Sequence, residues 1–361
     1  MSANVVTRST MHEEPLTGLR EQGGALWPVL VSDLHTPRPE VFWADLVASA
    51  VIGWLAFAAA VAAQLWSPQM WAAGVLAGFA LYRGLCFTHE ITHLKRGGVP
   101  GFETAWNLLF GMPLLLPSFT YLGVHQSHHS LSTYGTDADP EYLPFARSRR
   151  LIVVFALQSS VVVPVALFIR FIVLAPVGLA WPRFHRWLET HASAFAMNPA
   201  YRREVKPAMA WKMRRWEATV LVAWLAAFLS IRAGLLPWRA PLVWLAILAF
   251  VSFFNTLRVL GAHDYETDGT PRDRLKQVSD SIDTPGGPWT ALWAPVGLRY
   301  HALHHFFPGI PYHNLGAAYR RIMEAVPGDD RYRESTSPSL QASLAALYRK
   351  AKGADTSLRG R

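Results

Sequence analysis

The sequence predicts an all-α integral membrane protein with four transmembrane helices in two hairpins. Hydrophobic residues make up 51% of the chain and charged residues only 16%, a balance that excludes a largely disordered protein. Uncharged runs such as Leu46 to Trp66 and Ala240 to Leu257 match the roughly 20 residues that a helix needs to cross a bilayer. Lys and Arg gather between such runs, in 183–215, as they do in cytoplasmic loops.

The predicted transmembrane helices pair through short turns. They cover 43–66, 69–88, 218–236 and 240–257. Ser67-Pro68 separates the first pair, and 237–239 separates the second. Both turns are poor in Lys and Arg compared with 183–215, so the charge rule places them outside. We therefore expect a multi-pass protein of the inner (plasma) membrane whose termini and active site are cytoplasmic.

Two further apolar segments, 104–124 and 151–182, are expected not to cross the membrane. Pro113 interrupts the first segment, and Pro164 and Arg170 interrupt the second. Proline removes a backbone donor and disfavours a straight helix, and an arginine is costly inside a bilayer. We expect interfacial or re-entrant helices here, beneath a cytoplasmic cap rich in histidine.

The chain divides by composition into three parts. Residues 1–42 form a polar, cytoplasmic N-terminal segment without the apolar core of a cleavable signal peptide. Residues 43–325 form the membrane domain. Residues 326–361 form a polar tail, with a short helix expected from Pro338 to about Ala351, capped by Ser337.

Cysteine content and charge exclude other classes of protein. A single cysteine cannot form an intramolecular disulfide or hold an iron–sulfur cluster. The formal charge of +9 fits cytoplasmic loops facing anionic lipid, and no nucleic-acid partner is expected.

Histidine is the residue that carries chemistry here. Nine of the fourteen histidines stand in three clusters and one isolated position: His89 and His93; His125, His128 and His129; His301, His304 and His305; and His263. Spacings of three and four place side chains on one face of a helix, so each cluster can aim at one point. Nine imidazoles are too many for one ion, since zinc takes about four ligands and octahedral iron six. The pattern predicts two metal ions, and the catalytic groups are expected to be these ligands alone.

The metal hypothesis also constrains topology. If 151–182 crossed the membrane once, the histidine clusters would lie on opposite sides and could not share a site. His12, His35, His185 and His191 stand in polar stretches and are interpreted as ordinary. His313 has two interpretations, as a support for a ligand or as part of a helix start.

Two other functions remain open from the residues alone. His89-Glu90-x-x-His93 is also the pattern of zinc metalloproteases, with Glu90 as the general base. That interpretation leaves seven clustered histidines unexplained. A metal transporter would carry its ligands within the spans near the bilayer midplane, whereas these clusters stand at or beyond the ends of apolar runs.

The three clusters resemble the histidine boxes of the membrane fatty acid desaturase family. The order matches, with two spans between the second and third boxes, and the resemblance covers roughly 43–325. Supporting motifs are Asp137-Ala-Asp139-Pro140-Glu141 after the second box and Trp293 to Tyr300 before the third. The family implies a diiron centre, O2 as co-substrate and desaturation of a lipid acyl chain. Hydroxylation, or oxygenation of a carotenoid or sterol-type lipid, is the alternative within the superfamily.

The resemblance also implies a separate electron donor. No cytochrome b5-like His-Pro-Gly-Gly segment is present, so a ferredoxin-, rubredoxin- or cytochrome b5-like protein with its reductase is expected. The basic stretch 202–215 is interpreted first as a cytoplasmic loop and second as a docking surface. Some acyl-CoA desaturases have an asparagine four residues before the histidine that corresponds to His263. In this chain that position is Val259, and the nearest asparagine is Asn255. Carboxylates that could orient ligating imidazoles are Glu90, Asp139, Asp264 and Glu266.

Overall fold

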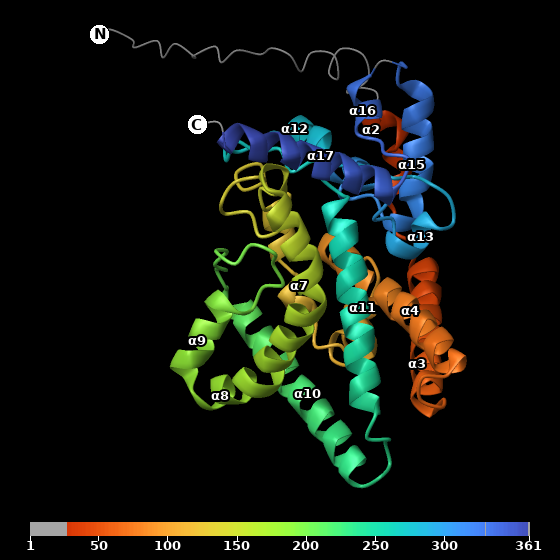
Figure 1. Cartoon of the computed structure of the whole chain (residues 1–361), viewed down its shortest axis with the longest axis vertical. Coiled ribbons are helices and arrows are strands. Elements are labelled where there is room, and N and C mark those ends of the chain that lie inside the picture. Colours follow the sequence, from red (N-terminus) through yellow and green to blue (C-terminus); the bar gives the residue numbers. More distant parts are fainter. Residues whose placement is uncertain (1–26, 329, 360–361) are drawn as a thin grey trace.

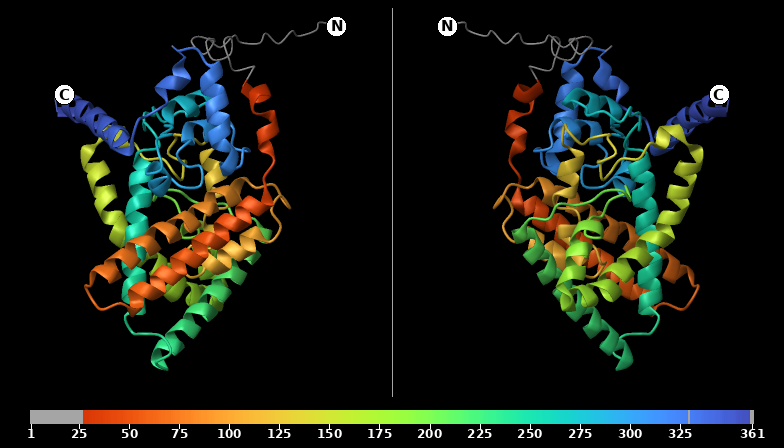
Figure 2. Two further views of the ribbon diagram at one scale, coloured as in Figure 1. Left: turned by 90° about the vertical axis from the view of Figure 1, so that its right-hand side faces the viewer. Right: turned by 90° about the vertical axis from the view of Figure 1, so that its left-hand side faces the viewer.

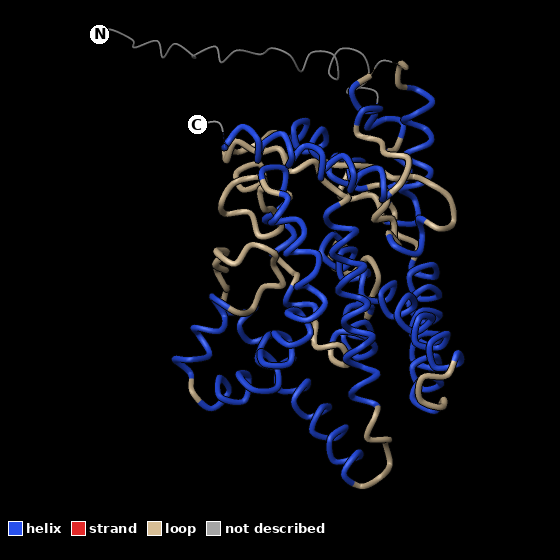
Figure 3. The backbone as a smooth tube through the Cα atoms, in the orientation of Figure 1, coloured by secondary structure: helices blue, strands red, loops and turns tan. Residues whose placement is uncertain are grey.

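The computed structural model describes residues 27–328 and 330–359, and within these ranges the protein is helical. Figure 3 shows helices joined by loops, without strands, and the β-type pairing is limited to isolated bridges such as His263 with Ser281. The prediction of an all-α fold is confirmed. Residues 1–26, which include His12, lie outside the described residues.

The helices form two layers, long helices below and a cap of short helices above (Figure 1). The long helices are α3 (Pro39–Ala62), α4 (Pro68–His93), α7 (Arg149–Phe168) with its continuation α8 (Ala175–Ala180), α10 (Pro207–Arg232) and α11 (Ala240–Leu260). Between them lie α5 (Phe102–Trp106), η3 (Asn107–Gly111), η4 (Ser118–Thr120), α6 (Val124–His128), η5 (Phe145–Arg147) and α9 (Pro182–His191). The cap contains α2 (Trp27–Leu30), η2 (Ser32–His35), α12 (Arg274–Asp280), α13 (Thr290–Trp293), α14 (His301–Phe306), α15 (Tyr312–Ala325), α16 (Arg331–Glu334) and α17 (Leu340–Arg359).

The first hairpin consists of α3 and α4, which pack against each other (Figure 2). Proline occupies the first turn of both helices, where its missing N–H leaves no hydrogen bond unmade. The Ser67 hydroxyl accepts from the Met70 amide and caps α4. Close packing continues at Gly84, where a Cβ would lie 1.9 Å from the Phe110 ring. The aromatic segment 102–110 therefore lies directly against α4, below the first histidine box.

Within the described residues, four helices are long and apolar enough to cross a membrane, as predicted in number: Pro39–Ala62, Pro68–His93, Arg149–Ala180 and Ala240–Leu260. The third of these, Arg149–Ala180, was not among the predicted spans. The predicted span at 218–236 lies within α10, which is not among the four. The first half of α10 contains Lys212, Arg214 and Arg215, which lower its hydropathy. In Figure 1, α10 and α11 diverge from their shared turn, and α11 packs mainly against α7 and α4.

The segment expected to be broken at Pro164 and Arg170 is instead one continuous helix. A π-helical stretch, η6 (Ile169–Leu174), connects α7 to α8 and absorbs the disturbance, with Pro176 in the first turn of α8. Arg170 is buried, forms a short ion pair with Glu217 of α10 and donates to the Ala192 carbonyl. Its charge is thus neutralised by tertiary contacts that the sequence pattern does not reveal.

The chain nevertheless returns to the histidine boxes after this helix. Arg149 begins α7 beside Tyr348 of the cap. After α9, the Phe195 amide donates to the Thr120 carbonyl, and the Met197 amide donates to the Pro140 carbonyl. The segment from 149 to 197 therefore starts and ends next to the second box. This return lets the segments on both sides of 149–197 in the chain contribute histidines to one region of the protein.

The cap has its own apolar core, centred on Trp27, Leu303, Ile322 and Tyr332. It is tied to the first hairpin at Tyr312, whose hydroxyl donates to Asp45 and whose backbone amide donates to Glu90. The predicted C-terminal helix is present as α17, which begins at Leu340 and packs against α7 and α11.

Candidate metal centre

Each histidine box lies at a helix end that faces the cap. His89 and His93 form the last turn of α4, with ring centroids 5.1 Å apart. The second box forms α6, a short helix that begins after Gly123. Gly123 has a φ of 81°, in the left-handed region that glycine adopts without strain. The third box lies on α14, and His263 follows the end of α11.

The structure brings all nine predicted histidines together, in two groups. The first group contains His89, His93, His125, His129 and His304, and the second contains His128, His263, His301 and His305. Within each group one nitrogen of every imidazole lies within 4.8 Å of the others. This partition differs from the boxes, since both the second and the third box contribute to both groups.

The Nε2 atoms converge both within the second box and between separate segments. The distances are 3.1 Å between His93 and His304, 3.0 Å between His125 and His129, and 2.9 Å between His263 and His301. The Nε2 of His89 is buried and has no hydrogen-bond partner among the described residues. Imidazole nitrogens suit iron, zinc and copper, and two groups of four and five match the two ions predicted. The donor set therefore fits two transition-metal ions.

Hydrogen-bond acceptors orient several rings through the opposite nitrogen. The Nδ1 of His125 lies 2.9 Å from Glu141 Oε1, and the Nδ1 of His128 lies 3.0 Å from each oxygen of Asp139. The Nδ1 of His263 lies 3.0 Å from the Tyr134 hydroxyl, which itself donates to Asp280. An acceptor at Nδ1 holds the proton there and leaves the Nε2 lone pair free for a metal.

Only part of the predicted carboxylate set has this role. Asp139 contacts His128, as the sequence suggested. Glu90 lies 3.4 Å from His89 Nδ1 and accepts mainly from the Tyr312 amide at 2.9 Å. Asp264 and Glu266 do not contact a ligand; both pair with Lys350.

Sequence reasoning missed other members of this shell. Glu141 was noted only as part of the motif after the second box, and Tyr134 and Asp280 were not singled out. Asp280 comes from a different part of the chain, so no spacing in the sequence points to it. Glu141 stands two residues after Asp139 in a motif already recognised, which was the available signal.

Burial keeps most of these imidazoles neutral. It lowers the pKa of His129, His263 and His305, and neighbouring imidazoles lower it further. Burial also lowers the pKa of His128, but the carboxylates of Asp139, Glu141 and Asp280 together outweigh it and leave the pKa above its ordinary value. Neutral imidazole is the form that binds metal, so the site is prepared for ligation at neutral pH.

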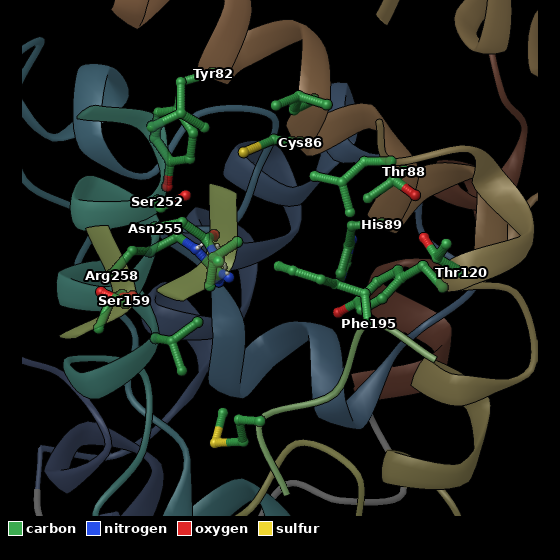
Figure 4. Close-up of a pocket in the computed structure, with 18 of the residues that line it drawn as sticks. Tyr82, Cys86, Thr88, His89, Thr120, Ser159, Phe195, Ser252, Asn255 and Arg258 are labelled. Carbon is green, nitrogen blue, oxygen red and sulfur yellow. Dashed lines mark hydrogen bonds between the residues drawn. The ribbon is translucent and has the colours of Figure 1, made fainter. Parts of the chain in front are cut away.

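A cavity of about 290 Å³ adjoins the first group (Figure 4). His89 lies in its wall, together with Cys86 and Thr88 of the same helix. Apolar side chains of α7 and α11, including Phe155, Leu248 and Val251, line another part. Residues 195–197 of the returning segment complete the wall. A ligand in this cavity would contact both apolar surface and the first histidine group.

The remaining described histidines lie outside both groups. His313 accepts from the Arg38 amide at 3.1 Å, just before α3, so it supports a helix start. His185 is not an ordinary polar-surface residue as predicted; it is buried between Glu189 and Glu217. His35 and His191 belong to neither group.

Comparison with known proteins supports one assignment. The model of the family described as fatty acid desaturase matches residues 66–336. A protein named ceramide hydroxylase from Caulobacter vibrioides (strain NA1000 / CB15N) is 38% identical over 327 residues, which cover 90% of this chain and 92% of the relative. Neither the zinc protease nor the transporter interpretation accounts for this match or for five imidazoles in one group. The chain is an oxidoreductase of the desaturase and hydroxylase superfamily, and it belongs to the fatty acid desaturase family.

Proposed function

We propose that the protein hydroxylates the acyl part of a ceramide-type membrane lipid in an O2-dependent reaction. The observation that carries the proposal is the cavity that His89 lines, because its wall combines apolar side chains with a member of the first histidine group. The named relative, a ceramide hydroxylase covered over nearly its whole length, favours hydroxylation and an amide-linked lipid. Desaturation of an acyl chain is the second candidate, favoured by the family match over 66–336.

The nine histidines are proposed to hold two iron ions, the first group one ion and the second group the other. The diiron centre supplies O2 activation, which no side chain can provide. Around it, Glu141 and Asp139 hold the tautomers of His125 and His128, so that their Nε2 atoms stay directed at the metal. Asp139 is fully buried and Glu141 is partly buried.

The cavity wall determines what reaches the centre. Phe155, Leu248 and Val251 would contact the methylene groups of the substrate and exclude water from them. Exclusion of water matters because it protects reactive species from side reactions. Catalysis then requires no further acid or base from the chain beyond the histidine set and its supports.

The electrons are proposed to come from a separate donor, a ferredoxin-, rubredoxin- or cytochrome b5-like protein with its reductase. The lone Cys86 is buried in the cavity wall and provides no redox pair for internal electron transfer. The proposed location is the inner membrane, with the cap and the histidine groups on the cytoplasmic side, where such a donor is accessible.

Lipid profiling tests the reaction. The protein is expressed in a bacterial host supplied with ceramide, under ¹⁸O2, and the lipids are analysed by mass spectrometry. Gain of one labelled oxygen in ceramide supports hydroxylation, whereas loss of two hydrogens without label supports desaturation. His301→Ala is the matched inactive control, and absence of any new lipid with the iron-loaded parent would refute both reactions.

A further inference from the structure

One side of the cavity is polar, and the proposed chemistry does not use it. This polar patch consists of Ser159 of α7 and Ser252, Asn255 and Arg258 of α11. Figure 4 shows the four side chains on the opposite side of the view from His89. They line the same cavity as His89 but belong to neither histidine group.

Arg258 has few hydrogen-bond acceptors for its five N–H groups. Among the described residues, its hydrogen bonds go only to Asn255 Oδ1, from Nε at 3.3 Å and from Nη2 at 3.1 Å. No carboxylate of the described chain forms an ion pair with it, whereas Arg83 and Arg170 each have one. A guanidinium carries five N–H donors, and leaving such a charge partly buried without acceptors is costly. The cavity occupant is the natural source of the missing acceptor.

The neighbouring groups favour an uncharged occupant. The hydroxyl protons of Ser159 and Ser252 are donated within their own helices, to Ala156 and Leu248, so their oxygens remain available as acceptors. Glu141 lines the same cavity, and its carboxylate interacts electrostatically with Arg258 without forming an ion pair among the described contacts. A second anion would be repelled by Glu141, but a group with one carbonyl acceptor and nearby N–H or O–H donors matches the whole patch.

We propose that the polar patch binds the amide of the lipid substrate, with Arg258 donating to the amide oxygen and Asn255 fixing the guanidinium. The serine oxygens accept from the amide N–H or an adjacent hydroxyl. This inference rests on the proposed function, because the bound lipid is its substrate. It assigns Arg258 as a specificity-determining residue.

The position of the polar patch adds a consequence. Arg258 and His89 line the same cavity, so a lipid whose amide is held at the polar patch presents carbons of the same molecule to His89. The inference therefore places oxidation on a carbon near the polar end of the lipid.

A binding measurement without turnover tests the assignment. Full-length, iron-loaded protein in detergent, with no electron donor, is titrated with radiolabelled ceramide. Arg258→Met should weaken binding by about ten- to a hundredfold, the loss expected for a hydrogen bond from a charged group. Asn255→Leu should weaken it by several-fold. Arg232→Met, at the exposed end of α10, is the matched control and should leave binding unchanged.

Three outcomes would overturn the assignment. One is ceramide binding within twofold of the parent in Arg258→Met at full iron content. The second applies if Arg258→Met loses iron and cannot be used. In that case, ceramide binding equal to the parent in Asn255→Leu at full iron content would overturn the assignment. The third is that Arg258→Met weakens the binding of a free fatty acid of equal chain length more than it weakens the binding of ceramide. That result would identify a site for a carboxylate.

The product gives a second readout that separates this inference from the proposed function. The parent should oxidise one carbon near the amide, and Arg258→Met should yield a mixture of positions with raised KM. Ceramide that binds through Arg258 without being oxidised would refute the proposed function and leave the polar patch standing. If Arg258→Met instead binds ceramide as the parent does and oxidises it at the same carbon, the role of the polar patch is refuted and the proposed function stands.

Discussion

The Nε2 atoms of His93 and His304 lie 3.1 Å apart, although 211 positions separate the two residues in the chain. At this separation both imidazoles can offer a nitrogen to one cation. The proposed metal would therefore join the last turn of α4 to α14.

Replacing His304 by alanine should remove iron from the first group. One of five imidazoles is lost, and His93 loses the partner across the interface. We expect fewer than two irons per chain by elemental mass spectrometry and no detectable lipid oxidation. His191→Ala, outside both groups, should retain two irons; equal iron loss in both variants would contradict the assignment.

Asp139→Asn should weaken the second group through His128. Asp139 is fully buried and its two oxygens contact His128 Nδ1, so the amide removes the charge that orients the ring. A loss of about 10- to 100-fold in metal affinity or activity is expected. Asp137→Asn is the control, since Asp137 is exposed two residues away. Chelator competition gives the affinity, and similar values for both variants would sink the prediction.

Asp283 should make the cap less stable as pH rises. Its carboxyl accepts from the Tyr332 hydroxyl and the Leu303 amide, and burial raises its pKa from 3.8 to about 7. A raised folded pKa means that the stabilisation is complete below about pH 4 and is lost as pH rises through about 7. At about 1.4 kcal/mol per pKa unit, the loss has a ceiling of about 4 kcal/mol.

The measurement is thermal unfolding in detergent between pH 5 and 8. Asp283→Asn should flatten the fall of the melting temperature with pH over this range. Asp268→Asn, at an exposed loop position, should keep the slope of the parent. An unchanged slope in Asp283→Asn would show that other groups govern the pH dependence.

Arg170 and Glu217 should be strongly coupled. Arg170→Met leaves Glu217 buried with only His185, and Glu217→Leu leaves Arg170 without its carboxylate. Each single change should destabilise the protein by roughly 3–5 kcal/mol, and the double variant by less than the sum. Unfolding in denaturant measures this, with exposed Arg214→Met as control; additive effects would contradict the coupling.

Cysteine labelling should place both sides of the histidine site on one face of the membrane. In a Cys86→Ser background, Ser132→Cys after the second box and Ser279→Cys before the third should react from the same side. Ala233→Cys, at the turn between α10 and α11, should react from the opposite side. Spheroplasts and inverted vesicles identify the cytoplasmic face, and opposite labelling of 132 and 279 would refute a shared site.

Much of the site could be predicted from the sequence because helix periodicity is a local property. The spacings within 89–93, 125–129 and 301–305 place the rings on helix faces, and all nine histidines do meet. Their partition into two groups was not predictable, because it depends on how α4, α6 and α14 cross. Glu141 and Asp280 approach the ligands through loops whose course no spacing indicates.

Local patterns by themselves thus determined the helical fold, the membrane character, three of the four candidate spans and the nine histidines that the structure brings together. Tertiary structure alone decided the rest. It neutralised Arg170 with Glu217, so that 149–180 became one helix despite its prolines. It also paired His304 with His93 and placed Arg258 in the cavity with His89. Long-range packing sets these contacts, whereas periodicity and charge extend only over neighbouring turns.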